Sequence, residues 1–428
     1  MKQQKSVDDP IWYPFTSLKN QSTPIKIVKG KGTLLYTDDG RVLIDAISSW
    51  WVNIHGHSNE YIAQAISQQA HQLEHVIFAG FTHEPAQKLA NNLLSSLPSS
   101  FTKVFFSDDG STAVEVGLKM SIQYWKNKGI LHKNKILAFE NAYHGDTFGA
   151  MSASGKSIFN QQFAPFLFDV VRIPLPTEDN IDAILQSLRT ILLEDDIAAF
   201  IYEPLVQGAG GMQMTTPALL DQILAFLSQK EIILIADEVM TGFGRTGQTW
   251  ASDYMPTKPD IMAVSKGITG GFLPLGVSLI SNKIVSAFDD ADANKTFFHG
   301  HSYTANPITC AAANASWELL QHKSCQKKID EITERHKAFI KSAQSVNGIE
   351  NLRNTGTILA FDIKSKDKTS YLNDINQKIK HLAIEKGVLL RPLGNVVYTL
   401  PPYSITDEEL TKVYDTFIEI AGELSTKI

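Results

Sequence analysis

Six short apolar runs in the middle of the chain predict buried β-strands. They lie at 104–106 (VFF), 136–139 (ILAF), 198–202 (AAFIY), 232–236 (IILIA), 261–264 (IMAV) and 275–280 (LGVSLI). Helical patterns lie between several of these runs. This alternation indicates an α/β fold with a mostly parallel sheet that helices cover on both faces. Because such sheets bind ligands at the carboxyl ends of their strands, the residues that follow each run are candidates for a functional site.

The clearest predicted helix follows the first run. After Ser111, apolar residues recur at helical spacing at 114, 118, 122 and 125, and Thr112 with Glu115 has the spacing of a capping-box pair. Gly110 permits close backbone approach, and Ser111 adds a hydroxyl where free N–H groups and the helix dipole favour an anion. An ordinary N-cap is the alternative interpretation.

The C-terminal part has a different pattern. Helices are predicted at 307–321, 326–345, 371–387 and 405–424, with strand-like segments at 352–363 and 387–402. This pattern is typical of an α+β unit. The residues before about His55 are expected to have no sheet of their own and to join that unit. We therefore predict an N-terminal segment at 1–54, a large domain at 55–307 and a small domain at 308–428.

Composition narrows the classes of function. The 428 residues carry 39 Lys and Arg against 45 Asp and Glu, a net charge of −6, and no basic stripe suited to nucleic acid. No apolar run is long enough for a membrane span, and the N-terminal residues lack the apolar core of a signal peptide. The two cysteines, Cys310 and Cys325, match no metal motif or disulfide framework, so we expect a cytoplasmic protein without a structural metal.

Chemically active side chains follow three other runs. Tyr143 and His144 come after 136–139 and could stack on a planar ligand or merely cover a loop. Asp237 follows the run 232–236 and could pair with a cation or cap the next segment. Lys266 follows 261–264; a partly desolvated lysine there would be nucleophilic towards a carbonyl, although most isolated lysines are simply solvated.

Taken together, these side chains match the needs of pyridoxal phosphate. A lysine forms its Schiff base, a carboxylate holds its pyridinium nitrogen protonated, and a helix start receives its phosphate. The glycine-rich stretches at 207–211 and 241–247 are weaker signals. Neither is a GxGxxG turn that opens a helix after a first strand, so a nicotinamide cofactor has no fingerprint here.

The sequence resembles a known family over nearly its whole length. The segments DEVMTGFGRTG at 237–247, SKGITGG at 265–271 and HGHSYTANP at 299–307 resemble the class-III, fold-type-I aminotransferases. Three further segments narrow the match to family members that aminate 8-amino-7-oxononanoate in biotin biosynthesis: SSWWVNIHG at 48–56, NAYHGDTFGAMS at 141–152 and LLRPLGNVVYTLPPY at 389–403. The Trp-Trp pair at 50–51 and the block RPLGNVVYTLPPY at 391–403 are much more specific than the motifs shared by the whole class.

The resemblance implies roles for the cofactor site. Lys266 matches the catalytic Schiff-base lysine, which also contacts the substrate and moves its proton. Asp237 matches the partner of the pyridinium nitrogen, and Tyr143 the aromatic residue that stacks on the ring beside the substrate. Gly110 and Ser111 match the phosphate-binding loop.

The resemblance also implies a homodimer with two shared active sites. Gly300, His301 and Ser302 match the loop that each subunit contributes to its neighbour, Gly300 towards the substrate and the other two towards the cofactor. His301-Ser302 replaces the commoner Pro-Thr or Ser-Thr. Ser302 keeps the hydroxyl, whereas nothing in the sequence explains His301.

Three residues match positions that bind substrate. Trp50 matches a residue lining the oxononanoate chain, Arg391 the group that receives its carboxylate, and Tyr398 a residue associated with the adenosylmethionine donor. Without the resemblance, a core tryptophan, a surface ion pair and an edge-strand aromatic would explain them equally well.

One departure affects the substrate site. Phe15 stands where a tyrosine commonly contacts the substrate, and the missing hydrogen bond is worth about 0.5–1.5 kcal/mol, enough to weaken binding without abolishing turnover. Tyr13 is a candidate to compensate.

The resemblance implies a two-stage transamination. S-adenosylmethionine would leave its amino group on the cofactor, which would then convert 8-amino-7-oxononanoate to 7,8-diaminononanoate. The alternatives are the same reaction with lysine as donor, another ω-aminotransferase acting on 4-aminobutyrate or ornithine, and a catalytically inactive binding protein. Retention of Lys266, Asp237 and Tyr143 together argues against the last.

Overall fold

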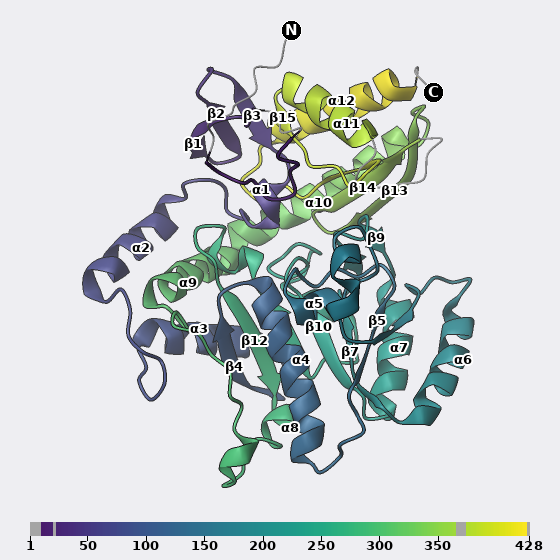
Figure 1. Cartoon of the computed structure of the whole chain (residues 1–428). Coiled ribbons are helices and arrows are strands. Elements are labelled where there is room, and N and C mark those ends of the chain that lie inside the picture. Colours follow the sequence, from purple (N-terminus) through teal and green to yellow (C-terminus); the bar gives the residue numbers. More distant parts are fainter. Residues whose placement is uncertain (1–9, 20–22, 365–373, 426–428) are drawn as a thin grey trace.

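A seven-stranded sheet forms the centre of the larger part of the molecule (Figure 1). The computed structural model describes residues 10–19, 23–364 and 374–425. The strand order is β4-β12-β11-β10-β7-β5-β6. The strands are β4 (Phe101–Ser107), β5 (Lys135–Phe139), β6 (Val170–Ile173), β7 (Ile197–Tyr202), β10 (Ile233–Asp237), β11 (Ile261–Val264) and β12 (Gly276–Ser281).

All six apolar runs lie in strands of this sheet, which confirms that prediction. The neighbours from β11 to β6 are parallel, while β12 runs antiparallel to both β11 and β4. The sheet is therefore mostly parallel, as predicted. Because β12 alone is reversed, the carboxyl ends of β4, β5, β7, β10 and β11 meet at one edge.

Helices cover both faces of the sheet, as predicted. Residues of α4 (Gly110–Asn127) pack with Ile136, Ile201 and Ile235 on one face. Residues of α3 (Glu84–Ser95), α6 (Ile181–Ile191) and α7 (Pro217–Gln229) pack with side chains that point to the other face, including Leu137 and Leu234. The alternation of side chains along each strand explains this division. Shorter or peripheral elements complete this part: α2 (Glu60–Gln72), α5 (Phe148–Ala153), α8 (Asn282–Val285), β8 (Val206–Gln207) and β9 (Gln213–Met214).

The start of α4 differs from the prediction. Its N-cap is Asp109, whose carboxylate accepts the Thr112 N–H at 2.9 Å while the Thr112 hydroxyl accepts the Asp109 N–H at 3.1 Å. The predicted Thr112–Glu115 capping box is therefore wrong, because the box begins three residues before Thr112. Glu115 instead accepts the N–H groups of Gly149 and Ala150 at the start of α5, at 2.7 and 3.0 Å.

Most of the C-terminal residues form a smaller unit, in the upper part of Figure 1. Strands β13 (Ile349–Thr355), β14 (Ile358–Ile363) and β16 (Val396–Thr399) form an antiparallel sheet. The four helices predicted from residue 307 onward are present as α9 (Pro307–Gln321), α10 (Lys323–Ala343), α11 (Asp374–Glu385) and α12 (Asp407–Ser425). The predicted start of the third, 371–373, lies outside the described residues. Within the described part of the chain, five short 3-10 helices lie elsewhere, at Gln161–Phe166, Leu192–Glu194, Ala251–Tyr254, Lys266–Thr269 and Ala293–Lys295.

The N-terminal residues contain strands that the sequence analysis did not expect. Strands β1 (Ile27–Lys31), β2 (Leu34–Thr37) and β3 (Val42–Asp45) form an antiparallel meander, and β3 pairs with β15 (Val388–Leu389). These strands have only four or five residues and little regular alternation, so their pattern was weak. The turn between β2 and β3 contains Gly40, whose φ of 85° suits glycine. The domain boundaries at 54 and 307 stay predictions.

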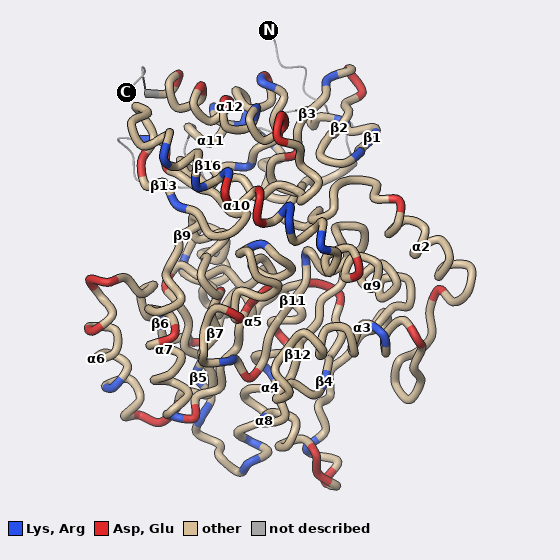
Figure 2. Tube along the Cα trace, turned by 180° about the vertical axis from the view of Figure 1, so that it is seen from behind, with Lys and Arg blue, Asp and Glu red and all other residues tan. Residues whose placement is uncertain are grey.

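Charged residues of both signs are interspersed over the two parts of the chain (Figure 2). Among the described residues, no helix combines the length and apolar character that crossing a membrane requires.

Candidate active site

A cavity of about 540 Å³ lies at the edge where the parallel strands end. The sheet forms its floor, and the turn of α1 (Ser48–Trp51) and segments after β15 form its opposite wall. Ten of the residues that the sequence analysis singled out line it: Phe15, Trp50, Gly110, Ser111, Tyr143, His144, Asp237, Lys266, Arg391 and Tyr398. They come from positions as far apart as 15 and 398, which the fold brings together.

Lys266 lies two residues after the end of β11, with Ser265 between them. Its φ is 41°, a backbone conformation that is uncommon for a residue with a side chain and that is frequent at functional sites. Its Nζ lies 5.1 Å from the centre of the Trp51 ring. Burial lowers the pKa of the Lys266 amine, against the opposing effect of the Asp237 and Glu203 carboxylates. A lowered pKa increases the share of the uncharged, nucleophilic amine.

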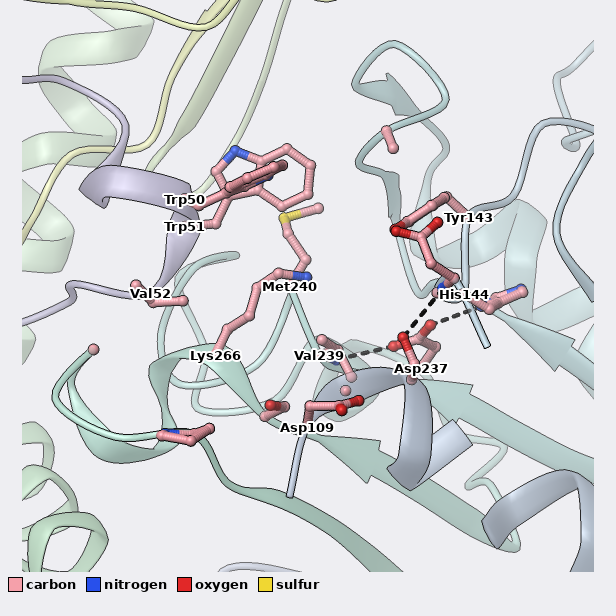
Figure 3. A pocket seen from close by; sticks show the side chains of 18 of the residues that line it. Trp50, Trp51, Val52, Asp109, Tyr143, His144, Asp237, Val239, Met240 and Lys266 are labelled. Atoms are coloured by element: carbon pink, nitrogen blue, oxygen red, sulfur yellow. Dashed lines mark hydrogen bonds and ion pairs between the residues drawn. The ribbon is translucent and has the colours of Figure 1, made fainter. Parts of the chain in front are cut away.

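Asp237 ends β10 and is almost fully buried, with 4% of its surface exposed. One carboxylate oxygen lies 2.7 Å from Nδ1 of His144 and the other accepts the Val239 N–H at 3.1 Å. Figure 3 shows Asp237 and His144 on one side of the cavity and Lys266 on the other. His144 lines the cavity and fixes the orientation of the Asp237 carboxylate. Its other ring nitrogen, Nε2, is buried and has no partner among the described residues.

Glu203 is a site residue that the sequence analysis missed. It follows β7, lines the cavity, and accepts the N–H groups of Tyr143 at 3.0 Å and Gly208 at 2.9 Å. Burial raises the pKa of its carboxyl group to about 7, with His144 lowering it and Asp237 raising it further. The signal was present, because Glu203 follows the apolar run 198–202 just as Lys266 follows 261–264.

The raised pKa of Glu203 predicts a pH-dependent cost to stability. Below about pH 4.5 the carboxyl group is protonated in both the folded and the unfolded chain; between 4.5 and about 7 only the folded chain keeps the proton, so stability falls as the pH rises. The full cost, about 3 kcal/mol, is present above pH 7. We expect Glu203→Gln to gain stability relative to the wild type between about pH 5 and about pH 8, as measured by urea denaturation.

The control for that prediction is Glu334→Gln, which changes an exposed carboxylate that pairs with Lys337. Its difference from the wild type should be nearly the same at both pH values. A Glu203→Gln difference that also stays constant with pH would contradict the shifted pKa.

The cofactor end of the cavity has the features of an anion site beside an aromatic cover. At the start of α4, the N–H groups of Gly110 and Ser111 have no acceptor within the helix. A Cβ atom on Gly110 would lie 2.7 Å from Cγ1 of Val239, so only glycine allows this close approach. Burial, and next the nearby Asp146, raise the pKa of the Tyr143 hydroxyl. A lysine amine, a buried carboxylate, an aromatic ring and a free helix N-terminus around one cavity fit pyridoxal phosphate.

The opposite end of the cavity is aromatic and carries one guanidinium group. Arg391 lies over the ring of Trp50 at 3.8 Å and near that of Phe15 at 5.7 Å. Phe15 packs edge-on against Trp50, with ring centres 5.6 Å apart. The Tyr398 hydroxyl accepts a hydrogen bond from Trp51 Nε1 at 3.1 Å, which helps to fix the orientation of the Trp51 ring. Trp50 was predicted to line the site, whereas the position of Trp51 over the Lys266 amine was not predicted (Figure 3).

Four named residues do not line this cavity: Tyr13, Gly300, His301 and Ser302. The loop that contains the last three is anchored by its own turn, in which the His301 N–H donates to the Thr304 hydroxyl at 3.1 Å. His301 Nε2 is buried without a partner among the described residues. Their predicted role in a neighbouring subunit stays a prediction.

The sequence matches known proteins over almost its full length. Residues 16–421 match the model of the class-III aminotransferase family. A relative from Synechococcus elongatus named adenosylmethionine-8-amino-7-oxononanoate aminotransferase is 48% identical, over 97% of this chain and 99% of its own. A relative of the same name from Helicobacter pylori is 36% identical, over 97% of this chain and 96% of its own.

Solved structures give the same result for the fold. An adenosylmethionine-8-amino-7-oxononanoate aminotransferase from Methanocaldococcus jannaschii superimposes with a TM-score of 0.92 at 32% identity, over 97% of both chains. An omega transaminase from Pseudomonas jessenii in complex with PMP superimposes with a TM-score of 0.91 at 26% identity, over 97% of this chain and 96% of that one. The chain therefore belongs to the class-III aminotransferases, a family of fold-type-I enzymes that transfer amino groups with pyridoxal phosphate as cofactor.

Proposed function

We propose that this enzyme converts 8-amino-7-oxononanoate to 7,8-diaminononanoate in biotin biosynthesis, with S-adenosylmethionine as the amino donor. The observation that carries the proposal is the aromatic wall with Arg391 stacked on Trp50, in the same cavity as Lys266. An acceptor with a long aliphatic chain and a terminal carboxylate needs an apolar surface for the chain and a guanidinium group for the carboxylate. The names of the relatives, at 48% and 36% identity, support the same substrates.

The residues at the strand ends would hold the cofactor. The N–H groups of Gly110 and Ser111 would receive its phosphate, Tyr143 would cover one face of its ring, and the Asp237 carboxylate would accept a hydrogen bond from the protonated ring nitrogen. His144 keeps that carboxylate in place through the 2.7 Å contact. When bound, pyridoxal phosphate supplies an electron sink for the negative charge that develops at the substrate carbon.

Lys266 would be the catalytic residue of the protein. Its uncharged Nζ would attach the cofactor at rest and, once the substrate amine has displaced it, would move a proton at the carbon that carries the amino group. The lowered pKa of the Lys266 amine suits both tasks. Trp51, packed over Nζ, would keep water away from the amine.

The proposal predicts the effect of removing the guanidinium group. Arg391→Ala is expected to raise the KM for 8-amino-7-oxononanoate about 10- to 150-fold, since a hydrogen bond to a charged group is worth about 1.5–3 kcal/mol, and to leave kcat nearly unchanged. Mass spectrometry of the diamine product, at varied acceptor and saturating donor, measures both constants. Arg41→Ala, at an exposed arginine paired with Asp39, is the control. An unchanged KM in Arg391→Ala would contradict the assigned carboxylate site.

We also propose a homodimer in which Gly300, His301 and Ser302 complete the active site of the partner. Large apolar side chains surround this loop: Ile77, Phe81, Phe298 and Tyr303 are 60%, 61%, 77% and 66% exposed. The two segments are neighbours, since Asn306 donates to the carbonyl of Glu74 at 2.9 Å. An exposed apolar surface of this kind is typical of a subunit interface.

A cytoplasmic location completes the proposal. Cys310 and Cys325 are both free thiols, as is usual in a reducing compartment.

A further inference from the structure

The turn that carries Trp50 and Trp51 has a strained backbone. Ser48, Ser49 and Trp51 have φ values of 50°, 59° and 70°, in the left-handed region that side chains disfavour. None of the three is glycine. Residues in this region persist only where surrounding contacts hold them. The contacts that hold this turn therefore determine where the two tryptophan rings lie.

Asp45 provides most of these contacts. It is the last residue of β3 and its side chain is completely buried. One oxygen accepts the Ile47 N–H at 3.2 Å, and the other accepts the N–H and the hydroxyl of Ser49 at 2.6 and 3.1 Å. The carboxylate thus binds the backbone on both sides of Ser48, where the chain enters the left-handed region.

His57 pairs with the same carboxylate and extends the network to the loop of Lys266. Its Nε2 donates to Asp45 at 2.8 Å, and its Nδ1 donates to the side-chain oxygen of Asn53 at 3.1 Å. The Asn53 amide nitrogen in turn donates to the carbonyl of Gly270 at 3.0 Å. Gly270 ends the 3-10 helix that begins with Lys266. His57 thus links the Asp45 carboxylate to the loop that carries Lys266.

The other side of the turn is held by the rest of the cavity wall. The Ser48 hydroxyl donates to the carbonyl of Leu400 at 2.9 Å, and the Arg245 guanidinium donates to the carbonyl of Trp51 at 3.3 Å. With these ends fixed, Trp51 lies over the Lys266 amine and Trp50 under Arg391. Figure 3 shows both rings directed into the cavity from this turn.

We propose that the hydrogen-bonded pair of Asp45 and His57 positions the substrate wall: it holds the strained Ser48–Trp51 turn so that Trp50 and Trp51 bind the acceptor chain. Neither residue touches the cavity, so both act through the tryptophans. The role in acceptor binding rests on the proposed function. The role in holding the turn does not.

The first test measures the turn itself, by hydrogen–deuterium exchange with mass spectrometry on the cofactor-loaded enzyme. Asp45→Asn replaces an acceptor oxygen by a donor that faces the N–H groups of Ile47 and Ser49. We expect exchange in peptides covering 46–53 to become about tenfold faster or more, with peptides from β10 unchanged. Asp39→Asn, at an exposed carboxylate near the same sheet, is the matched control. Wild-type protection of 46–53 in Asp45→Asn would overturn the proposal.

The second test separates positioning from a general loss of structure. In Asp45→Asn the KM for 8-amino-7-oxononanoate should rise about tenfold while kcat per folded site stays within about threefold. A fall in kcat in proportion to lost folded enzyme, with KM unchanged, would overturn the positioning role. If Asp45→Asn does not fold, His57→Asn replaces it, because that variant keeps the carboxylate; it should give smaller changes in the same direction, and no change would overturn the proposal. If the wild type does not use this acceptor, the proposed function fails, and the exchange experiment still decides whether the Asp45–His57 pair holds the turn.

Discussion

Replacing Lys266 with alanine is expected to abolish transamination, with a loss of turnover of at least about 10⁴-fold at saturating substrates. Alanine offers no amine to attach the cofactor and no group that can move the proton. The fold should survive, because the substitution shortens a side chain that faces a cavity. The measurement is the rate of diamine formation by mass spectrometry, compared with Lys88→Ala at an exposed lysine paired with Glu318.

Borohydride reduction tests directly whether the cofactor is attached to Lys266. Borohydride treatment of the loaded wild type should fix the cofactor on the peptide that contains Lys266, and no such adduct should form in the alanine variant. Near-normal turnover in Lys266→Ala would refute the assignment of the catalytic residue.

The second large effect is expected for Asp237→Asn, with kcat reduced about 10²- to 10³-fold. An uncharged amide cannot hold a proton on the ring nitrogen, and the loss of one preorganised electrostatic partner typically costs this much. The amide would also place a donor against either the Val239 N–H or His144, both of which now face the carboxylate. Steady-state kinetics with each substrate saturating measures the effect.

The control is Asp182→Asn on the outer helix α6, where the carboxylate is exposed. It should leave kcat unchanged. An Asp237→Asn variant that retains more than a tenth of the wild-type kcat would contradict the role given to this carboxylate.

The parts of the fold that the sequence predicted are those with strong periodic signals. The apolar runs from 104 to 280 became strands of one sheet because strands buried on both faces need unbroken apolar sequence. The rule that ligands bind at the carboxyl ends of such strands then led to Gly110, Tyr143, Asp237 and Lys266, all of which line the cavity.

The predictions that failed concern short or tertiary features. Strands β1 to β3 are too short to show a period, and the pairing of β3 with β15 joins residues more than 340 positions apart. The capping box was misplaced because Asp109, Ser111 and Thr112 are all good N-cap residues, and only the observed backbone decides between them. The strained turn at 48–51 could not be foreseen, since it depends on distant partners such as Arg245 and Leu400.

The residues predicted to bind substrate came from the resemblance to known aminotransferases. Trp50, Arg391 and Tyr398 have no local signal that separates them from an ordinary core or surface residue. The structure adds Trp51 and Glu203 to the cavity and connects Asp45 to it through the Ser48–Trp51 turn.

The most direct test of the proposed reaction is the donor half-reaction. The enzyme is loaded with pyridoxal phosphate, the acceptor is omitted, candidate donors are added singly, and the visible absorbance of the bound cofactor is followed. S-adenosylmethionine should remove the colour and 8-amino-7-oxononanoate should restore it. Loss of colour with lysine alone would keep the product and change the donor, whereas a response only to 4-aminobutyrate or ornithine would contradict the role in biotin biosynthesis.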